Sequence, residues 1–296
     1  MTKPQVASSA QDSTSLLVSN YDLDATLTSG QAFRWTKSND CWLGVVSGHA
    51  VRLTHTPDAI HAQSFPPVSD WHWLSDYLQI EVNLGNIIST FPKDEPMKRA
   101  VAHCQGLHVL KQDPWECLAS FILSSTKQIV QIQQIIRSLC RCFGDPLQGF
   151  PDVPTQYTFP SAEALAKASE AELRACKMGF RAPYLLRTAQ AVDSGAVDLE
   201  RCRSVEVEEA REMLMTLPGV GRKIADCVLL FAYGFQEAFP IDVWVLRALR
   251  ELYFPNRVVT LKRLQEFASN HFAPNSGYAQ QYLFHFMRMT AGRRAK

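Results

Sequence analysis

Apolar residues recur at helical spacing over 207–214 and again over 224–231, and a short glycine-containing turn separates the two runs. The first run holds Val207, Ala210, Met213 and Leu214, and the second holds Ile224, Val228 and Phe231. Spacings of three and four residues place each set on one face of an α-helix. The pattern therefore predicts a helix, a tight turn with the sequence LPGVG, and a second helix.

The predicted turn and the start of the second helix suit an anion. Gly219 and Gly221 allow positive φ and carry no Cβ, so the backbone N–H groups around them can point together at one phosphate. Lys223 falls in the first turn of the second helix, and Cys227 lies one turn further along the same face. Beyond this helix, Asp242 is a natural N-cap for another apolar helical run.

The N-terminal region shows a different pattern. Short runs of strand-forming residues alternate with turn clusters at 15–18, 32–36, 41–46, 51–55 and 59–63, which predicts an antiparallel meander. From residue 69 onward the spacing is helical, with helices expected at 69–104, 114–125, 127–143, 161–168, 170–177, 183–194, 261–272 and 278–289. The fold class is therefore α+β. We expect a disordered tail over 1–14, an antiparallel sheet domain with helices over 15–112, part of which packs on the following domain, and an all-helical domain over 113–296.

Composition indicates a globular chain without a membrane span. Of the 296 residues, 46% are hydrophobic, but no apolar run approaches the roughly 20 residues that a spanning helix needs. The first 14 residues hold one Lys and no Arg, unlike a secretory signal or a transit peptide. The eight cysteines form no C-x-x-C pair, and we expect them to be reduced.

The net charge of +1 hides an asymmetry along the chain. Residues 1–126 carry 8 Lys and Arg against 12 Asp and Glu, whereas residues 127–296 carry 22 against 17. The basic half also holds the predicted hairpin, which favours contact with nucleic acid there.

Taken together, the hairpin, the Lys two residues after it and the later Pro-x-Asp resemble the helix-hairpin-helix DNA glycosylase superfamily. Three further strings resemble its 8-oxoguanine DNA glycosylase family: SGQAFRW at 29–35, YLQIEVNLGNI at 77–87 and QDPWECLASFILSS at 112–125. The resemblance extends from about residue 16 to residue 289. It implies a sheet domain followed by a helix-hairpin-helix glycosylase domain, with a cleft between two helical lobes.

This resemblance assigns two catalytic residues. Lys223 matches the amine that attacks C1′ of the sugar and forms a Schiff base. Asp242 matches the carboxylate that stays ionised and stabilises positive charge on the sugar. Taken singly, a lysine is an ordinary surface residue and an aspartate a helix cap, so the functional interpretation rests on their joint spacing.

A base pocket is implied in the same way. Gly30 matches a glycine whose carbonyl accepts a hydrogen bond from N7–H, which oxidised guanine has and guanine lacks. Cys227 and Phe284 match the pair that sandwiches the base, and Gln280 matches the reader of its Watson–Crick edge.

The implied DNA contacts include three departures from the family pattern. The hairpin residues Gly219, Val220 and Gly221 match a phosphate cradle, Phe180 an aromatic wedge in the base stack, and Arg181 a reader of the opposite cytosine. Thr126 stands where members carry an asparagine-rich run, Gln131 where many carry arginine, and Trp244 where many carry histidine. We therefore expect weaker discrimination of the opposite base.

The resemblance implies a bifunctional 8-oxoguanine DNA N-glycosylase with AP lyase activity in base excision repair. Two alternatives stay open: a helix-hairpin-helix glycosylase for alkylated or ring-opened purines, and a DNA-binding module without catalysis. The expected partner is double-stranded DNA containing oxidised guanine, bound by a monomer. We expect an intracellular location with the DNA, in the nucleus of a eukaryote or in the cytoplasm and nucleoid of a bacterium.

No cofactor is expected. The iron–sulfur cluster of some superfamily members needs four closely spaced C-terminal cysteines, and Cys227 is the last cysteine here. No protein metal site is predicted, and a monovalent or divalent cation at the hairpin is left open.

Overall fold

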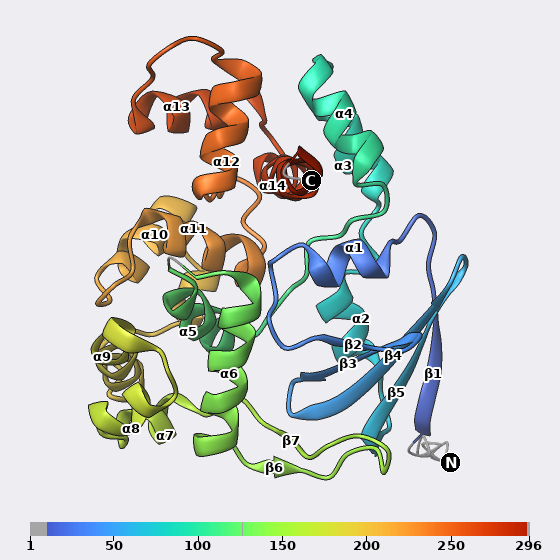
Figure 1. The fold of residues 1–296 in the computed structure, drawn as a ribbon, viewed down its shortest axis with the longest axis vertical. Coiled ribbons are helices and arrows are strands. Elements are labelled where there is room, and N and C mark those ends of the chain that lie inside the picture. The colour runs from blue at the N-terminus through green and yellow to red at the C-terminus, as the bar shows by residue number, and fades with distance from the viewer. Residues whose placement is uncertain (1–10, 126, 295–296) are drawn as a thin grey trace, which may run out of the picture.

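The computed structural model describes residues 11–125 and 127–294, and its fold is α+β, as predicted. Five antiparallel strands form the N-terminal sheet in the order β1-β5-β4-β3-β2. Their bounds are β1 (Gln11–Leu17), β2 (Thr36–Ser38), β3 (Cys41–Val46), β4 (His49–Thr56) and β5 (Ala59–Val68). Figure 1 shows this sheet on one side of the molecule and the helical region on the other.

Two-residue turns join β2 to β3, β3 to β4 and β4 to β5, so each of these strands pairs with the next one in the sequence. In the β3–β4 hairpin, Val46 pairs with His49, and Ser47 and Gly48 have φ values of 49° and 77°. Positive φ at both positions gives the turn a twist that matches the strands.

The structure corrects two expectations about the first strands. Strand β1 begins at Gln11, and Gln11, Ser13 and Thr14 pair with β5, so residues 11–14 are not part of a tail. The predicted strand at 32–36 is wrong, because only Thr36 belongs to a strand. Phe33 and Trp35 are buried in an irregular segment, and tertiary packing takes the place of strand pairing.

Helices α1 (Leu23–Thr28) and α2 (His72–Leu78) cover one face of the sheet. Their buried leucines pack with apolar side chains of β3, β4 and β5, and Trp35 belongs to the same cluster. Asp22 begins α1, since its carboxylate accepts a hydrogen bond from the Ala25 N–H at 2.8 Å. This short helix was not predicted.

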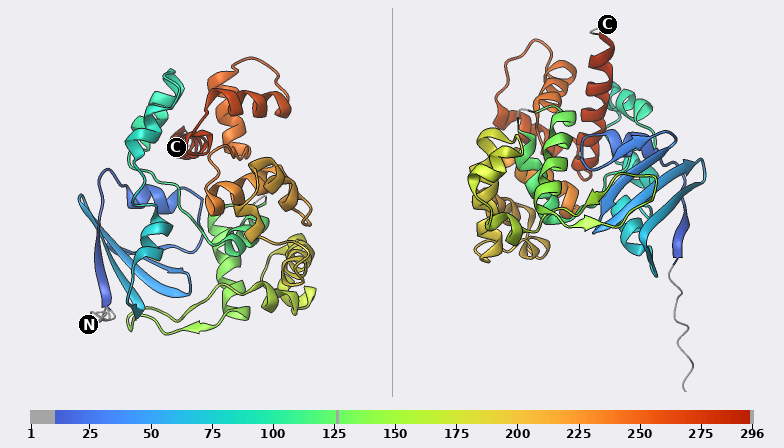
Figure 2. Two further views of the ribbon diagram at one scale, coloured as in Figure 1. Left: turned by 180° about the vertical axis from the view of Figure 1, so that it is seen from behind. Right: turned by 60° about the horizontal axis from the view of Figure 1, so that its bottom comes forward.

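The remaining helices build the second part of the fold (Figures 1 and 2). In chain order they are α3 (Leu84–Ser89), α4 (Glu95–His103), α5 (Pro114–Ser124), α6 (Ile129–Phe143), α7 (Ala162–Ala166), α8 (Glu170–Ala175), η1 (Gly179–Arg181), α9 (Ala182–Asp193), η2 (Glu200–Arg203), α10 (Val207–Met215), α11 (Arg222–Val228), η3 (Leu229–Tyr233), α12 (Val243–Ala248), η4 (Leu249–Tyr253), α13 (Leu261–His271) and α14 (Ser276–Arg294), with the short strands β6 (Pro146–Leu147) and β7 (Gln156–Tyr157) between α6 and α7.

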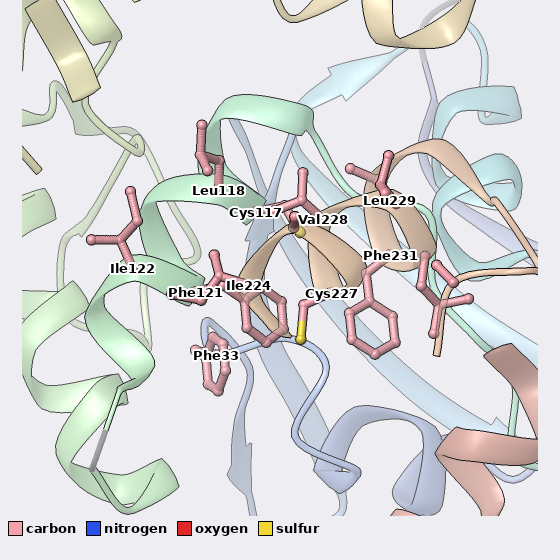
Figure 3. Packing of buried hydrophobic residues seen from close by; sticks show 14 of the residues in the cluster. Phe33, Cys117, Leu118, Phe121, Ile122, Ile224, Cys227, Val228, Leu229 and Phe231 are labelled. Atoms are coloured by element: carbon pink, nitrogen blue, oxygen red, sulfur yellow. The ribbon is translucent and has the colours of Figure 1, made fainter. Parts of the chain in front are cut away.

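The helical core is centred on α5 and α11. Phe121 of α5 stacks on Phe231 of η3 with ring centroids 5.5 Å apart, and Phe33 from the sheet region enters the same cluster (Figure 3). Helix α4 packs against α14, and the Tyr282 hydroxyl donates to the Leu107 carbonyl at 3.1 Å. The helical region therefore has one large core, to which Phe33 contributes, and the sheet packs with α1 and α2 in a second cluster. Among the described residues, no helix is both long and apolar enough to cross a membrane.

Candidate active site

The helix-hairpin-helix unit is formed by α10, the turn at 216–221 and α11. Gly219 has φ 79°, and a Cβ added there would lie 2.8 Å from Cγ of Tyr184. Gly221 differs from the expectation of positive φ, because its φ of −94° and ψ of 177° are extended and it caps α11. The Val220 N–H bonds to the Leu217 carbonyl at 3.1 Å and closes the turn.

A buried ion pair joins the two helices of this unit. Arg211 Nε of α10 lies 2.6 Å from Asp226 Oδ1 of α11, with side chains only 5% and 4% exposed. Glu208 contacts Arg211 as well, and Arg222 lies 3.7 Å from Asp226 Oδ2. Sequence reasoning missed this pair, since charged residues at helical spacing are usually solvated. The pair therefore ties α10 to α11 through a buried contact.

Lys223 is half-buried at the start of α11 and faces helix α5. Its Nζ lies 3.3 Å from Ser124 Oγ and 5.2 Å from the centre of the Phe121 ring. Cys227 follows one turn later and is buried among aromatic side chains (Figure 3). Burial raises the pKa of the Cys227 thiol to about 12, while the charge and hydrogen bonding of Lys223 act in the opposite direction. The amine and the thiol are thus neighbours.

Asp242 caps α12, as predicted. Its Oδ1 accepts hydrogen bonds from the Trp244 N–H at 3.0 Å and the Val245 N–H at 2.8 Å. Burial raises the pKa of Asp242, and the cap hydrogen bonds and the charge of Lys223 act against that rise. The carboxylate is therefore both fixed in orientation and close enough to Lys223 to feel its charge.

Two of the predicted pocket residues, Gly30 and Phe284, meet between the sheet region and α14, and Gln280 lies one turn before Phe284 on that helix. Gly30 has φ 77°, and a Cβ added there would lie 3.2 Å from Phe284 Cε1 and 3.0 Å from Ile129 Cδ1. Gln280 is buried, and its Nε2 donates to the Pro240 carbonyl at 3.0 Å. Its Oε1 is also buried and has no hydrogen-bond partner among the described residues. An unpaired buried acceptor of this kind is costly unless a ligand satisfies it.

The predicted wedge segment lies beside the hairpin. Phe180 is 57% exposed, whereas Arg181 is buried with its guanidinium 4.3 Å from the centre of the Phe180 ring. Tyr184 of α9 makes an edge contact with Phe180 at 6.5 Å and also packs on Gly219. Tyr184 therefore links the wedge to the hairpin, and its role could not be seen from the sequence.

The three departures from the family pattern have different settings. Gln131 is exposed, but its Oε1 accepts a hydrogen bond from the Gln128 N–H at 3.1 Å as part of the cap of α6. Trp244 is half-buried beside Asp242. Thr126 lies outside the described residues. No group of three or more His, Cys, Asp or Glu side chains arranged for a metal ion occurs in the described part of the chain.

The helical region and its hairpin define a class of repair proteins. Residues 119–274 match the family model of HhH-GPD superfamily base excision DNA repair proteins, and residues 15–118 match the model of the 8-oxoguanine DNA glycosylase N-terminal domain. The N-glycosylase/DNA lyase OGG1 of Arabidopsis thaliana is 34% identical over 88% of this chain and 76% of its own length. The chain belongs to the 8-oxoguanine DNA glycosylase family.

Solved structures agree with this assignment. The fold matches MBOgg1 in complex with a low-affinity DNA ligand at a TM-score of 0.90 and 34% identity, covering 96% of this chain and 98% of that one. It matches the Clostridium acetobutylicum 8-oxoguanine glycosylase/lyase, in complex with double-stranded DNA containing cytosine opposite 8-oxoG, at 0.88 and 30% identity, covering 93% and 94%. The chain is thus an enzyme of the DNA glycosylase class.

Proposed function

We propose that this enzyme excises 8-oxoguanine from double-stranded DNA and then cuts the strand by β-elimination. The observation that carries the proposal is the grouping of Lys223, Cys227 and Asp242 on α11 and α12, with Gln280 bonded to the Pro240 carbonyl two residues before Asp242. An amine, a carboxylate and an unpaired acceptor for a base thus belong to one site.

In the proposed chemistry, the neutral amine of Lys223 attacks C1′ as the bond between C1′ and N9 breaks and the base leaves with the electron pair. Asp242 stabilises the positive charge that develops on the sugar. The sugar ring then opens to a Schiff base at C1′, and loss of a C2′ proton expels the 3′ phosphate. Because burial raises the pKa of Asp242, the carboxylate is suited to accept and return protons in these steps.

Recognition of the base combines four contacts. The Gly30 carbonyl accepts a hydrogen bond from N7–H of 8-oxoguanine. The unpaired Oε1 of Gln280 accepts from the N–H groups of the Watson–Crick edge, which guanine presents as donors. Cys227 and Phe284 hold the two faces of the base. Since the Phe284 ring packs against Gly30, it moves aside when the base enters.

DNA binding uses the hairpin and the wedge. Gly219, Val220 and Gly221 cradle a phosphate of the duplex, and the exposed Phe180 fills the space of the extruded base. Arg181, Gln131, Thr126 and Trp244 are the proposed contacts near the opposite base and the phosphates. The protein acts as a monomer on duplex DNA inside the cell, in the nucleus of a eukaryote or the nucleoid of a bacterium.

The proposed chemistry needs no cofactor, since every step uses groups of the protein or the DNA. We propose that the enzyme carries no iron–sulfur cluster, because its eight cysteines include no closely spaced set of four. A cation bound by carbonyl groups at the hairpin stays an open part of the proposal.

Borohydride trapping tests the proposed nucleophile. Wild-type protein should become covalently joined to a duplex containing 8-oxoguanine, and Lys223→Gln should neither trap nor cut. Asp242→Asn should bind the lesion but excise it at least a hundredfold more slowly. Lys98→Gln serves as a control, since Lys98 is an exposed lysine of α4. Trapping by Lys223→Gln would show that another amine reacts.

A panel of duplexes tests the proposed substrate. The same lengths of DNA carry 8-oxoguanine, 7-methylguanine, 3-methyladenine or no lesion. Excision of 8-oxoguanine alone, or together with its ring-opened form, supports the proposal. Preferential release of the methylated bases would assign the enzyme to alkylated purines, and binding without any excision would reduce it to a DNA-binding module.

A further inference from the structure

Side chains hold the carbonyl groups on either side of Gly30. Arg288 Nη2 donates to the Thr28 carbonyl at 2.5 Å, and Gln281 Nε2 donates to the Ser29 carbonyl at 3.0 Å. On the other side, Gln112 Nε2 donates to the Gln31 carbonyl at 2.8 Å. The Gly30 carbonyl has no donor among the described residues. Three of four consecutive carbonyls are thus fixed by side chains, and the fourth is left for another donor.

Arg288 is unusual for its surroundings. Its guanidinium lies 5.7 Å from the centre of the Phe284 ring, and Nη1 would lie 3.2 Å from a Cβ added at Gly30. Nη1 is buried and has no acceptor among the described residues. A half-buried cation with a buried, unsatisfied donor atom is a costly way to pack a helix against a loop, and an apolar side chain would cost less. Stability alone therefore does not explain an arginine here.

Both donors belong to the helix that carries the proposed base contacts. Gln281 follows Gln280 directly, and Arg288 lies one turn after Phe284 on α14. The loop that ends at Gly30 is thereby tied to the helix that holds the reader of the Watson–Crick edge and the ring beneath the base. The Gly30 carbonyl lies in the planar Gly30–Gln31 peptide unit. Because the peptide units on both sides of it are held by side chains, this unit has little freedom to turn.

We propose that Arg288 and Gln281 are positioning residues that aim the Gly30 carbonyl at N7–H of the damaged base. This inference rests on the proposed function. Discrimination of 8-oxoguanine from guanine at N7 depends on one hydrogen bond, whose strength falls steeply when its direction or distance changes. Displacement of a catalytic or binding group by about 1 Å can lower a rate about a hundredfold.

The test compares two reactions of the same protein. Single-turnover excision of 8-oxoguanine needs the base pocket, whereas strand cleavage at a preformed abasic site uses Lys223 and the DNA contacts but no base. For Arg288→Met and for Gln281→Leu, we expect excision to fall about tenfold to a hundredfold. Cleavage at the abasic site should stay within about twofold of wild type.

A matched control is available on the other side of α14. Arg99 lies over the Phe286 ring at 5.5 Å, so Arg99→Met removes an arginine–phenylalanine contact of this helix at a distance from Gly30. Both reactions should be unchanged in this variant. If it lost excision selectively as Arg288→Met does, loosening of the helix would explain the effect and the inference would be wrong.

The remaining outcomes separate the inference from the proposed function. Equal losses of excision and abasic-site cleavage in Arg288→Met would indicate a general structural role and overturn the inference. Wild-type rates of excision in both variants would overturn it too. Wild-type protein that cuts abasic sites but leaves 8-oxoguanine in place would refute the proposed substrate. The positioning role would then fail together with the proposed function, and this result is seen in the wild type and not in the variants.

Discussion

The buried pair Arg211–Asp226 offers a quantitative test of how the hairpin is held. Its Nε–Oδ1 distance is 2.6 Å, and both side chains are almost fully buried. The other charges nearby face water, since the side chain of Arg222 is 42% exposed and that of Glu208 is 62% exposed. Exposed partners compensate a buried charge only weakly. Asp226 therefore depends on Arg211, and so does the packing of α10 on α11.

We expect Arg211→Leu to lower the free energy of unfolding by about 3 to 5 kcal/mol, because it leaves a buried carboxylate without its partner. Burial raises the pKa of Asp226, and Arg211 is the strongest influence against that rise. In the variant, folded Asp226 therefore keeps a proton that the unfolded chain has released. Stability then falls as pH rises from the unfolded pKa toward the folded one, by at most about 1.4 kcal/mol per pH unit.

Urea unfolding at pH 5 and pH 8 measures this effect. The loss of stability should be larger at pH 8 than at pH 5. The double variant Arg211→Leu/Asp226→Leu should recover most of it, since two apolar side chains can replace a buried pair at little cost. Arg201→Leu is the control, because its pair with Glu209 is exposed and contributes about 1 kcal/mol or less. A loss below about 1 kcal/mol at pH 8, or a double variant as unstable as the single one, would refute the reasoning.

Three further predictions follow from particular side chains. Gln131→Arg should raise the preference for cytosine over adenine opposite the lesion by about tenfold, and loss of the α6 cap should lower stability by about 1 kcal/mol. Single-turnover excision measures the first effect and urea unfolding the second. An unchanged preference would show that other residues read the opposite base. Purified protein should contain no stoichiometric iron by elemental analysis, and visible absorption by a bound cluster would contradict this. Burial lowers the pKa of His285 from 6.5 to about 4, so its neutral form stabilises the fold above pH 6.5 and this contribution is lost as pH falls toward 4. Wild type should therefore lose about 2 kcal/mol more stability than His285→Phe between pH 7 and pH 5; equal losses would place the acid sensitivity elsewhere.

The sequence predicted the elements whose signals are local. Asp113 and Asp242 are the N-caps of α5 and α12, and both aspartates make the expected cap hydrogen bonds. The strand expected at 32–36 failed because Phe33 and Trp35 are strand-forming residues used for tertiary packing. Phe33 makes an edge contact with Phe121 of α5 at 5.5 Å, and Trp35 fills the space that Gly44 leaves open. No periodic pattern of residues in the sequence signals either contact.

The site divides in the same way between local and distant contacts. Lys223, Cys227 and Asp242 could be named because a turn, a helix face and a cap set their spacing. Arg288 could not, since it bonds to Thr28, which is 260 positions away. Every residue has the same backbone carbonyl, whatever its side chain. The residue type at the accepting end of such a hydrogen bond therefore gives no signal in the sequence. It follows that substitutions at Thr28 or Ser29 that keep the backbone path should preserve excision, whereas loss of the donors on α14 should not. The side chains proposed to position the Gly30 carbonyl therefore lie on the C-terminal helix, and not in the loop that contains Gly30.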